Sequence, residues 1–249
     1  MTALNLRKYP WLKFDVVKLN VITLNTKGNK FIFVKILKIL IFGLFLDMQT
    51  SLSLQYPFIL ASNSPRRKEI LRSAGFDFSV LPSDVDESFS AEMKPQEVPV
   101  HLAERKANEL ARISPNALVL AADTVVILGN SILNKPLDKS EAIYMLQQLS
   151  GKTHEVVTGI ALHTPQGLFK KADSALVTFR SFEDWEIDFY VREGSCLDKA
   201  GSYGVQDFLG MVGIESIQGS FYTVMGLPIF DVYQLMKPYI LDGKQLMIR

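Results

Sequence analysis

The stretch ALVLAADTVVILGNSIL, residues 117–133, decides how the chain is expected to fold. Ala117–Leu128 is rich in valine and leucine, which is typical of a strand buried inside a sheet. Gly129-Asn130 separates it from Ser131–Leu133, and two extended runs around a two-residue glycine turn predict a β-hairpin. Asp123 interrupts the apolar run, where a carboxylate is costly unless it is paired, hydrogen-bonded or bound to a metal. The stretch therefore predicts a buried strand with a charged group within it.

Strands and helices alternate on both sides of this hairpin. A helix is predicted to begin at Ser64-Pro65 and to end at Gly75, because serine caps a first turn, proline suits the first helical position and glycine ends helices. Further strands are expected at residues 58–61, 76–81, 155–163 and 172–179, and further helices at 99–112, 140–149, 183–191 and from 228 onward, after a glycine-rich stretch at 201–226. This mixture predicts an α/β fold with a mixed, twisted sheet, helices on both faces, and two lobes around a cleft.

The amino-acid composition is that of an ordinary globular protein, and the distribution of charge limits which binding partners are expected. Of the 249 residues, 48% are apolar and 21% are charged. Residues 1–47 carry eight basic and two acidic side chains, whereas residues 48–249 carry nineteen basic and twenty-four acidic ones. The acidic main body argues against a nucleic-acid polymer as partner, but a small phosphate ligand needs only a local cluster of cations. The single cysteine, Cys196, excludes an internal disulfide and a cysteine-rich zinc site.

Residues 1–47 are interpreted as an N-terminal extension, and residues 48–249 as a single domain. The extension contains FIFVKILKILIFGLFL at Phe31–Leu46, which is short for a transmembrane helix of about 20 apolar residues and is followed by no secretory cleavage site. Three interpretations stay open: disordered or untranslated sequence ahead of a true start at Met48, a basic amphipathic helix on a membrane surface, or a packing role. We expect no membrane partner.

The first candidate for chemistry is Ser62-Asn63-Ser64-Pro65-Arg66-Arg67. A strand that leads into a helix N-terminus places free N–H groups and the positive end of the helix dipole at one point, which favours an anion. Two hydroxyls can add hydrogen bonds to phosphate oxygens, and two arginines can bind them in bidentate fashion. The alternative is an ordinary capped helix with a solvated basic first turn. The segment lacks the glycine pattern of a P-loop.

Four other charged residues are further candidates for a catalytic or binding site, but none of them establishes one by itself. Asp123 is a candidate metal ligand or general base, or else a strand-end acid that reaches solvent. Taken alone, Glu87, Lys106 and Lys135 are each better explained as surface charges, and His154 as a structural residue. Any chemistry would therefore use carboxylates, cations and a divalent metal ion.

Seven runs, taken together, resemble the Maf family of nucleotide pyrophosphatases. They occur in the family's order and span about residues 58–237, whereas residues 1–47 have no counterpart in the family. The runs are ILASNSPRR, LAERKA, AADTVV, NKP, LSGKTHEVVTG, DKAGSYGVQ and GSFYTVMGLP.

The resemblance implies a fold akin to inosine triphosphatases, frequent dimerisation, a cytoplasmic location, and hydrolysis of a nucleoside triphosphate to the monophosphate and pyrophosphate with Mg²⁺ or Mn²⁺. Asp123 matches the family's proton acceptor, and Asp123 and Glu87 are the candidate metal ligands. The remaining matches are the catalytic positions Glu87 and Lys106 and the phosphate-binding positions Ser62, Ser64, Arg66, Arg67 and Lys135.

Substrate choice within the family depends on three positions, occupied here by Arg67, Thr124 and Gln206. These residues match the members that act on dTTP and UTP, so the resemblance implies a pyrimidine enzyme that also accepts modified pyrimidine triphosphates. A 7-methyl-GTP-directed enzyme, and a nucleotide-binding regulator of septum formation or cell division without important catalysis, are the alternatives. Three departures from the family pattern are Asn63, Ser202 and Asp207, and the last two are expected to touch the base pocket.

Overall fold

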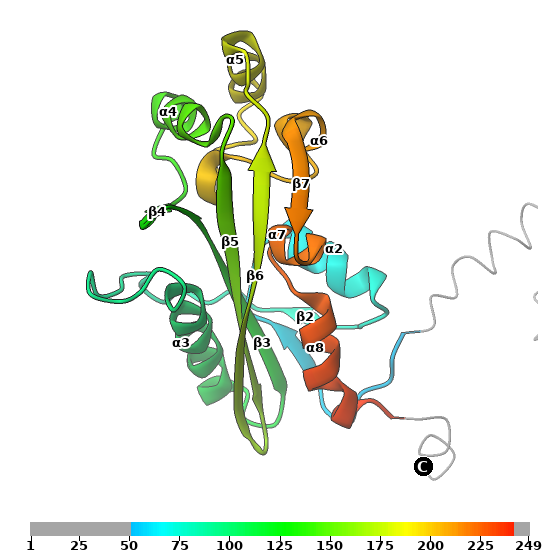
Figure 1. The fold of residues 1–249 in the computed structure, drawn as a ribbon. Helices are drawn as coiled ribbons and strands as arrows, with labels where there is room; N and C mark the ends of the chain where they lie inside the picture. Colours follow the sequence, from blue (N-terminus) through cyan, green and yellow to red (C-terminus); the bar gives the residue numbers. More distant parts are fainter. Residues whose placement is uncertain (1–50, 242–249) are drawn as a thin grey trace, which may run out of the picture. The chain divides into compact units, whose positions relative to one another are not determined.

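A computed structural model describes residues 51–241, in which seven strands form one mixed sheet (Figure 1). The strand order is β2-β1-β3-β5-β6-β7, and β4 pairs with β3 beside this path. β1 is parallel to β2 and to β3, whereas the other pairings are antiparallel. The strands are β1 Phe58–Leu60, β2 Ser79–Val80, β3 Leu118–Leu128, β4 Ser131–Leu133, β5 Thr153–Thr164, β6 Gly167–Phe179 and β7 Ile214–Gln218.

Helices cover both faces of this sheet, as predicted. Apolar side chains of α3 pack on β3 and β5 on one face, while α2 and α8 pack on the other face. At the far end of the sheet, α4 and α5 cover the ends of β5 and β6 (Figure 1). The helices are α2 Pro65–Ser73, α3 Val98–Ile113, α4 Lys139–Leu149, α5 Asp184–Arg192, α6 Phe208–Gly213, α7 Phe221–Val224 and α8 Ile229–Met236, with short 3₁₀ turns η2 Ala200–Ser202 and η3 Lys237–Tyr239.

The central strand β3 explains the apolar run that predicted it. Successive side chains of a strand point to opposite faces of the sheet. Leu118 and Leu120 pack against the α2 and α8 face, whereas Val119 and Ala121 pack against α3, and all four are fully buried. A strand buried on both faces has no polar alternation, so the sequence shows a continuous apolar run.

One edge of β3 is only partly paired. Its first residues, 118–120, pair with β1, and its last residues, 126–128, pair with β4. Its other edge pairs continuously with β5 over residues 119–127. Within residues 51–241, no strand pairs with 121–125 on the first edge. The chain therefore leaves an opening beside the middle of β3, where Asp123 and Thr124 lie.

Several predicted boundaries are confirmed. Ser64 is the N-cap of α2 and accepts a hydrogen bond from the Arg67 backbone N–H, while Gly75 follows the helix with a φ of +84°. That conformation is costly for residues with a side chain. The β3–β4 hairpin turns at Gly129-Asn130, as predicted.

Other predicted boundaries are wrong. The strand expected at 76–81 is reduced to Ser79–Val80, because its partner β1 is only three residues long. β6 begins at Gly167 and not at Ala172, since its first half is largely exposed, without the apolar alternation of a half-buried strand, and is ordered by pairing with β5. The glycine-rich stretch 201–226 contains α6, β7 and α7, which were not predicted.

The predictions for residues 1–47 lie outside the described residues. Within residues 51–241, no helix combines the length and apolar character that crossing a membrane requires.

Candidate active site

A cavity of about 620 Å³ lies at the opening beside β3. It is bounded by the start of α2, the middle of α3, the segment after β4 and the segment around η2. All ten residues that the sequence singled out as site residues line it, and they come from six separate places in the chain. They are Ser62, Ser64, Arg66, Arg67, Glu87, Lys106, Asp123, Thr124, Lys135 and Gln206.

The predicted phosphate segment forms one wall of this cavity. Ser62 Oγ accepts hydrogen bonds from the Ser64 backbone N–H and from Arg67 Nη1, both at 3.2 Å. Arg67 also donates from Nε to the Gly226 carbonyl at 2.8 Å and from Nη2 to Thr124 Oγ1 at 3.2 Å. Burial lowers the pKa of Arg67, against the opposing charge of Asp123, but a guanidinium stays protonated in proteins. Arg67 is thus a fixed cation that joins α2, β3 and the segment after α7.

A lysine between two carboxylates forms the second wall. Lys106 Nζ lies 2.6 Å from Glu87 Oε1 and 2.6 Å from Asp123 Oδ1. Lys106 lies on the inner face of α3, in line with Val98, Leu102 and the other buried positions, and the residue is only 9% exposed. The family resemblance named this residue, and the local signal that the sequence also offered is a charge on an apolar helix face, because buried charges need partners.

Glu87 is the more solvated member of this group, with 54% of its side chain exposed. Partial burial pushes its pKa upward, but the hydrogen bond and charge of Lys106 outweigh this effect and hold the pKa of Glu87 below its ordinary value. Glu87 is therefore a carboxylate at neutral pH. Glu87 lies in the segment between β2 and α3, outside any helix or strand, so no local sequence pattern predicts that its side chain reaches the cavity.

A second charged cluster, of which Arg66, Asp198 and Lys199 line the same cavity, was not predicted from the sequence. Arg66 Nη1 lies 3.6 Å from Asp198 Oδ2, and the buried Lys199 Nζ lies 3.0 Å from both Asp198 Oδ1 and Asp207 Oδ2. Tyr190 donates to Asp207 Oδ2 at 2.7 Å. The available signal was a pair of adjacent charges, Asp198-Lys199, inside the family run DKAGSYGVQ, from which only Gln206 was named as a site residue.

Two of the three departures from the family pattern do not line the cavity. Ser202 is fully buried, and its hydroxyl lies 3.2 Å from Met145 Sδ in the core. Asp207 faces Lys199 and Tyr190. The expectation that both touch a base pocket is wrong, because the Ser202 hydroxyl lies against Met145 and the Asp207 carboxylate is held by Lys199 and Tyr190. Asn63, the third departure, does line it.

His154 is structural, as expected. It is buried against Phe179, its Nε2 lies 2.7 Å from the Tyr203 hydroxyl, and burial lowers its pKa to about 4.

Asp123 and Glu87 are the carboxylates that fit a metal ion. Each directs one oxygen to Lys106 and so has a second oxygen to offer. No group of three histidine, cysteine, aspartate or glutamate side chains within residues 51–241 is placed to hold a metal. Mg²⁺ is commonly bound by one or two carboxylates together with substrate phosphates and water. The two-carboxylate set therefore suits a metal that arrives with a phosphate ligand.

Comparison with known proteins adds to this geometry. A family model described as Maf-like protein matches residues 57–239. The dTTP/UTP pyrophosphatase of Aquifex aeolicus (strain VF5) is 45% identical over 179 residues, which cover 72% of this chain and 93% of that protein. The dTTP/UTP pyrophosphatase of Bacillus pumilus (strain SAFR-032) is 42% identical over 181 residues, which cover 73% and 95%. Among solved structures, the Staphylococcus aureus Ham1 protein aligns with a TM-score of 0.43 at 16% identity, covering 73% of this chain and 98% of that chain.

Proposed function

The chain belongs to the Maf family, and on that premise we propose that it hydrolyses dTTP and UTP, with modified pyrimidine relatives, to the nucleoside monophosphate and pyrophosphate. dTTP and UTP are the two substrates in the names of its relatives, the dTTP/UTP pyrophosphatases. One observation carries the proposal at this chain's own residues. A Lys106-bridged carboxylate pair and an arginine-bearing helix start face the same cavity of about 620 Å³.

Asp123 is the proposed proton acceptor. Water attacks the α-phosphorus, a new P–O bond forms, the bond to the bridging oxygen breaks, and the water proton passes to Asp123. Lys106 holds one oxygen of Asp123 at 2.6 Å, which orients the other oxygen for this transfer. Because Lys106 is buried on α3 and Asp123 stands on the central strand, the acceptor is held on rigid elements.

Positive charge for the triphosphate comes from both sides of the cavity. Arg66 and Lys135 line it, and the hydroxyls of Ser62 and Ser64 stand at the helix start. Asp123 and Glu87 would hold Mg²⁺ or Mn²⁺, which when bound would neutralise phosphate charge. Charge stabilisation of this kind matters most as the pyrophosphate leaves with its full negative charge.

Selectivity is assigned to Arg67, Thr124 and Gln206. Arg67 and Thr124 bind each other directly, and Gln206 lines the same cavity with an exposed side chain. The Gln206 amide and the Arg67–Thr124 pair can reject a base whose hydrogen-bond donors and acceptors do not match theirs, because a buried polar group left without a partner is costly.

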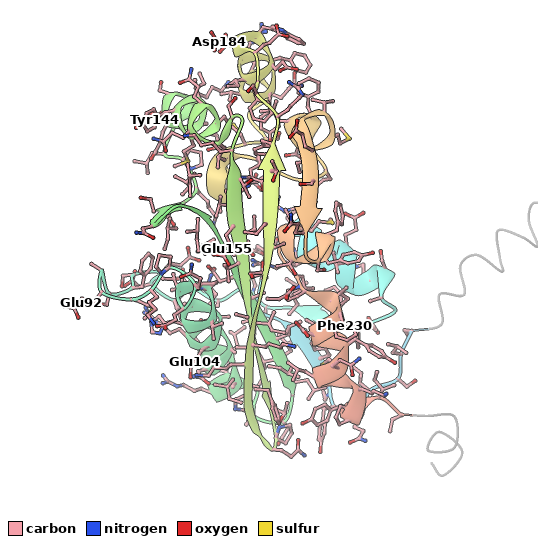
Figure 2. All side chains as sticks on the ribbon, viewed as in Figure 1. Glu92, Glu104, Tyr144, Glu155, Asp184 and Phe230 are labelled. Carbon is pink, nitrogen blue, oxygen red and sulfur yellow. The ribbon has the colours of Figure 1, made fainter. Side chains whose placement is uncertain are left out.

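The test is pyrophosphate release from a panel of dTTP, UTP, CTP, GTP and 7-methyl-GTP with Mg²⁺ or Mn²⁺. Wild type should act on dTTP and UTP, and Asp123→Asn should lower the rate by about 10²-fold or more while nucleotide binding survives. The matched control is Asp184→Asn, an exposed carboxylate in α5 at the far end of the sheet (Figure 2), which should leave the rate unchanged.

Two outcomes would contradict the proposal. Turnover of 7-methyl-GTP with dTTP and UTP untouched would reassign the substrate. Nucleotide binding without pyrophosphate release under either metal would favour a binding regulator. A dimeric state and a cytoplasmic location, which the resemblance implies, stay predictions.

A further inference from the structure

A continuous chain of hydrogen bonds runs from the cavity into the sheet. Arg67 Nη2 and Thr124 Oγ1 are 3.2 Å apart, Thr124 Oγ1 and Thr158 Oγ1 are 2.9 Å apart, and Thr158 Oγ1 lies 2.8 Å from the Thr223 carbonyl oxygen. Thr158 stands directly opposite Thr124 on β5 and is fully buried. It does not line the cavity, so any effect of Thr158 on a substrate must pass through Thr124.

The direction of every bond in this chain is fixed. A carbonyl oxygen can only accept, so the single proton of Thr158 is donated to Thr223. Thr158 therefore has no proton for Thr124, and Thr124 must donate in the 2.9 Å contact between the two hydroxyls. Since a guanidinium also only donates, Arg67 donates to Thr124.

The consequence is a defined polarity at the cavity wall. The only proton of Thr124 points into the sheet, so its hydroxyl can only accept from a ligand. Beside it, Arg67 uses three N–H groups on protein atoms within residues 51–241, and of its five donors two remain for a ligand oxygen. Gly226 keeps this pair open, because even a Cβ there would come within 3.3 Å of Thr124 Oγ1.

We propose that Thr158 is a positioning residue that sets Thr124 as a hydrogen-bond acceptor, so that Arg67 and Thr124 together select a ligand edge with an N–H beside a carbonyl. Uracil and thymine present such an edge, with N3–H beside a carbonyl oxygen. Cytosine presents an acceptor at N3 and an amino group beside it, which opposes both Thr124 and Arg67. The inference rests on the proposed function and assigns the source of its selectivity.

The test replaces Thr158 by valine, which has the same shape but no hydroxyl. The Thr223 carbonyl keeps its other donor, the Gly226 N–H at 3.0 Å, so no buried acceptor is left without a partner. Thr124 loses its internal acceptor and becomes able to donate to N3 of cytosine. The ratio of kcat/KM for UTP to kcat/KM for CTP should fall by about tenfold, the size of effect typical of one hydrogen bond in a buried site.

Two controls separate polarity from packing. Thr158→Ser keeps the hydroxyl and should retain the wild-type ratio. Thr178→Val removes a hydroxyl from another cross-strand threonine pair of β5 and β6, which lies outside the cavity, and should change neither rate nor ratio. If Thr158→Val does not fold, Thr158→Ala removes the same hydroxyl with less bulk in its place.

A folded Thr158→Val that slows both substrates equally, or keeps the wild-type ratio, would overturn the inference while leaving the proposed function intact. If wild type releases pyrophosphate from no triphosphate, the proposed function fails instead. Calorimetric binding of UMP and CMP then tests the polarity directly. Equal affinity of wild type for the two, or binding of neither, would overturn the inference.

Discussion

Replacing Lys106 by methionine tests the charged centre of the cavity most directly. The substitution keeps the apolar stem of the side chain and removes the ammonium, which lies 2.6 Å from Asp123 and from Glu87. Removing one partner of a buried ion pair leaves an uncompensated charge and costs about 3–5 kcal/mol. Because Glu87 is half-exposed and the group opens on a cavity, we expect the lower end, about 3 kcal/mol, in the free energy of unfolding.

The assay is urea-induced unfolding at neutral pH, with Lys106→Met compared with the double variant Lys106→Met/Asp123→Asn. The double variant removes both buried charges and should regain at least about 1 kcal/mol, so the two changes should couple strongly. The control Lys152→Met removes an exposed lysine and should stay within about 0.5 kcal/mol of wild type.

The pH dependence carries a definite sign. Because Lys106 holds the pKa of Glu87 below 4.5, the stability that Glu87 contributes is fully present above 4.5 and is lost as the pH falls through the lower folded-state pKa. The gap between wild type and Lys106→Met should therefore narrow below about pH 4.5. A Lys106→Met protein as stable as wild type at neutral pH, or a double variant no more stable than the single one, would refute the reasoning.

Two further predictions concern other parts of the fold. Gly226→Ala places a side chain at a φ of +98° and 3.3 Å from Thr124 Oγ1, so the free energy of unfolding should fall by about 1 kcal/mol or more and the KM for UTP should rise. Urea-induced unfolding and initial rates measure the two effects. An unchanged KM would contradict the assignment of Arg67 and Thr124 to the substrate-binding wall of the cavity. Hydrogen bonds from the Arg180 guanidinium lower the pKa of Glu186 to about 2, so the stability that this ion pair contributes should be lost only as the pH falls from 4.5 toward 2. Arg180→Met should lack this contribution, which urea-induced unfolding at several pH values measures. A difference in the free energy of unfolding between the two proteins that does not shrink over that pH range would count against the ion pair.

The sequence predicted those parts of the fold that have a local physical cause. The continuous apolar run of β3 follows from burial on both faces, and the start of α2 follows from the Ser64 cap. The helix and strand of 208–218 have no comparable signal, because α6 is only six residues long and β7 is largely exposed. They are ordered by their packing and pairing partners, which lie elsewhere in the chain.

The residues of the candidate site also divide into those with a local sequence signal and those without one. Lys106 could be noticed because a lysine interrupts an apolar helix face, and Asp123 because it interrupts an apolar strand. Thr158 could not, since a threonine within a run of β-branched residues is typical of any strand. Its importance depends on the register that places it opposite Thr124, and on the Thr223 carbonyl from a segment sixty-five residues further along the chain.

The pleat of β3 accounts for how one strand serves two purposes. Asp123 and Thr124 are consecutive, so they point to opposite faces, Asp123 toward Lys106 on α3 and Thr124 toward Arg67 on α2. The proposed proton acceptor and the proposed selective wall thus stand on the same backbone without sharing a partner. A register slip of one residue would exchange them, and the ladder from Val119 to Ile127 with β5 holds that register. Changes at Thr158 should therefore alter substrate choice, and changes at Asp123 the rate, with little coupling between the two.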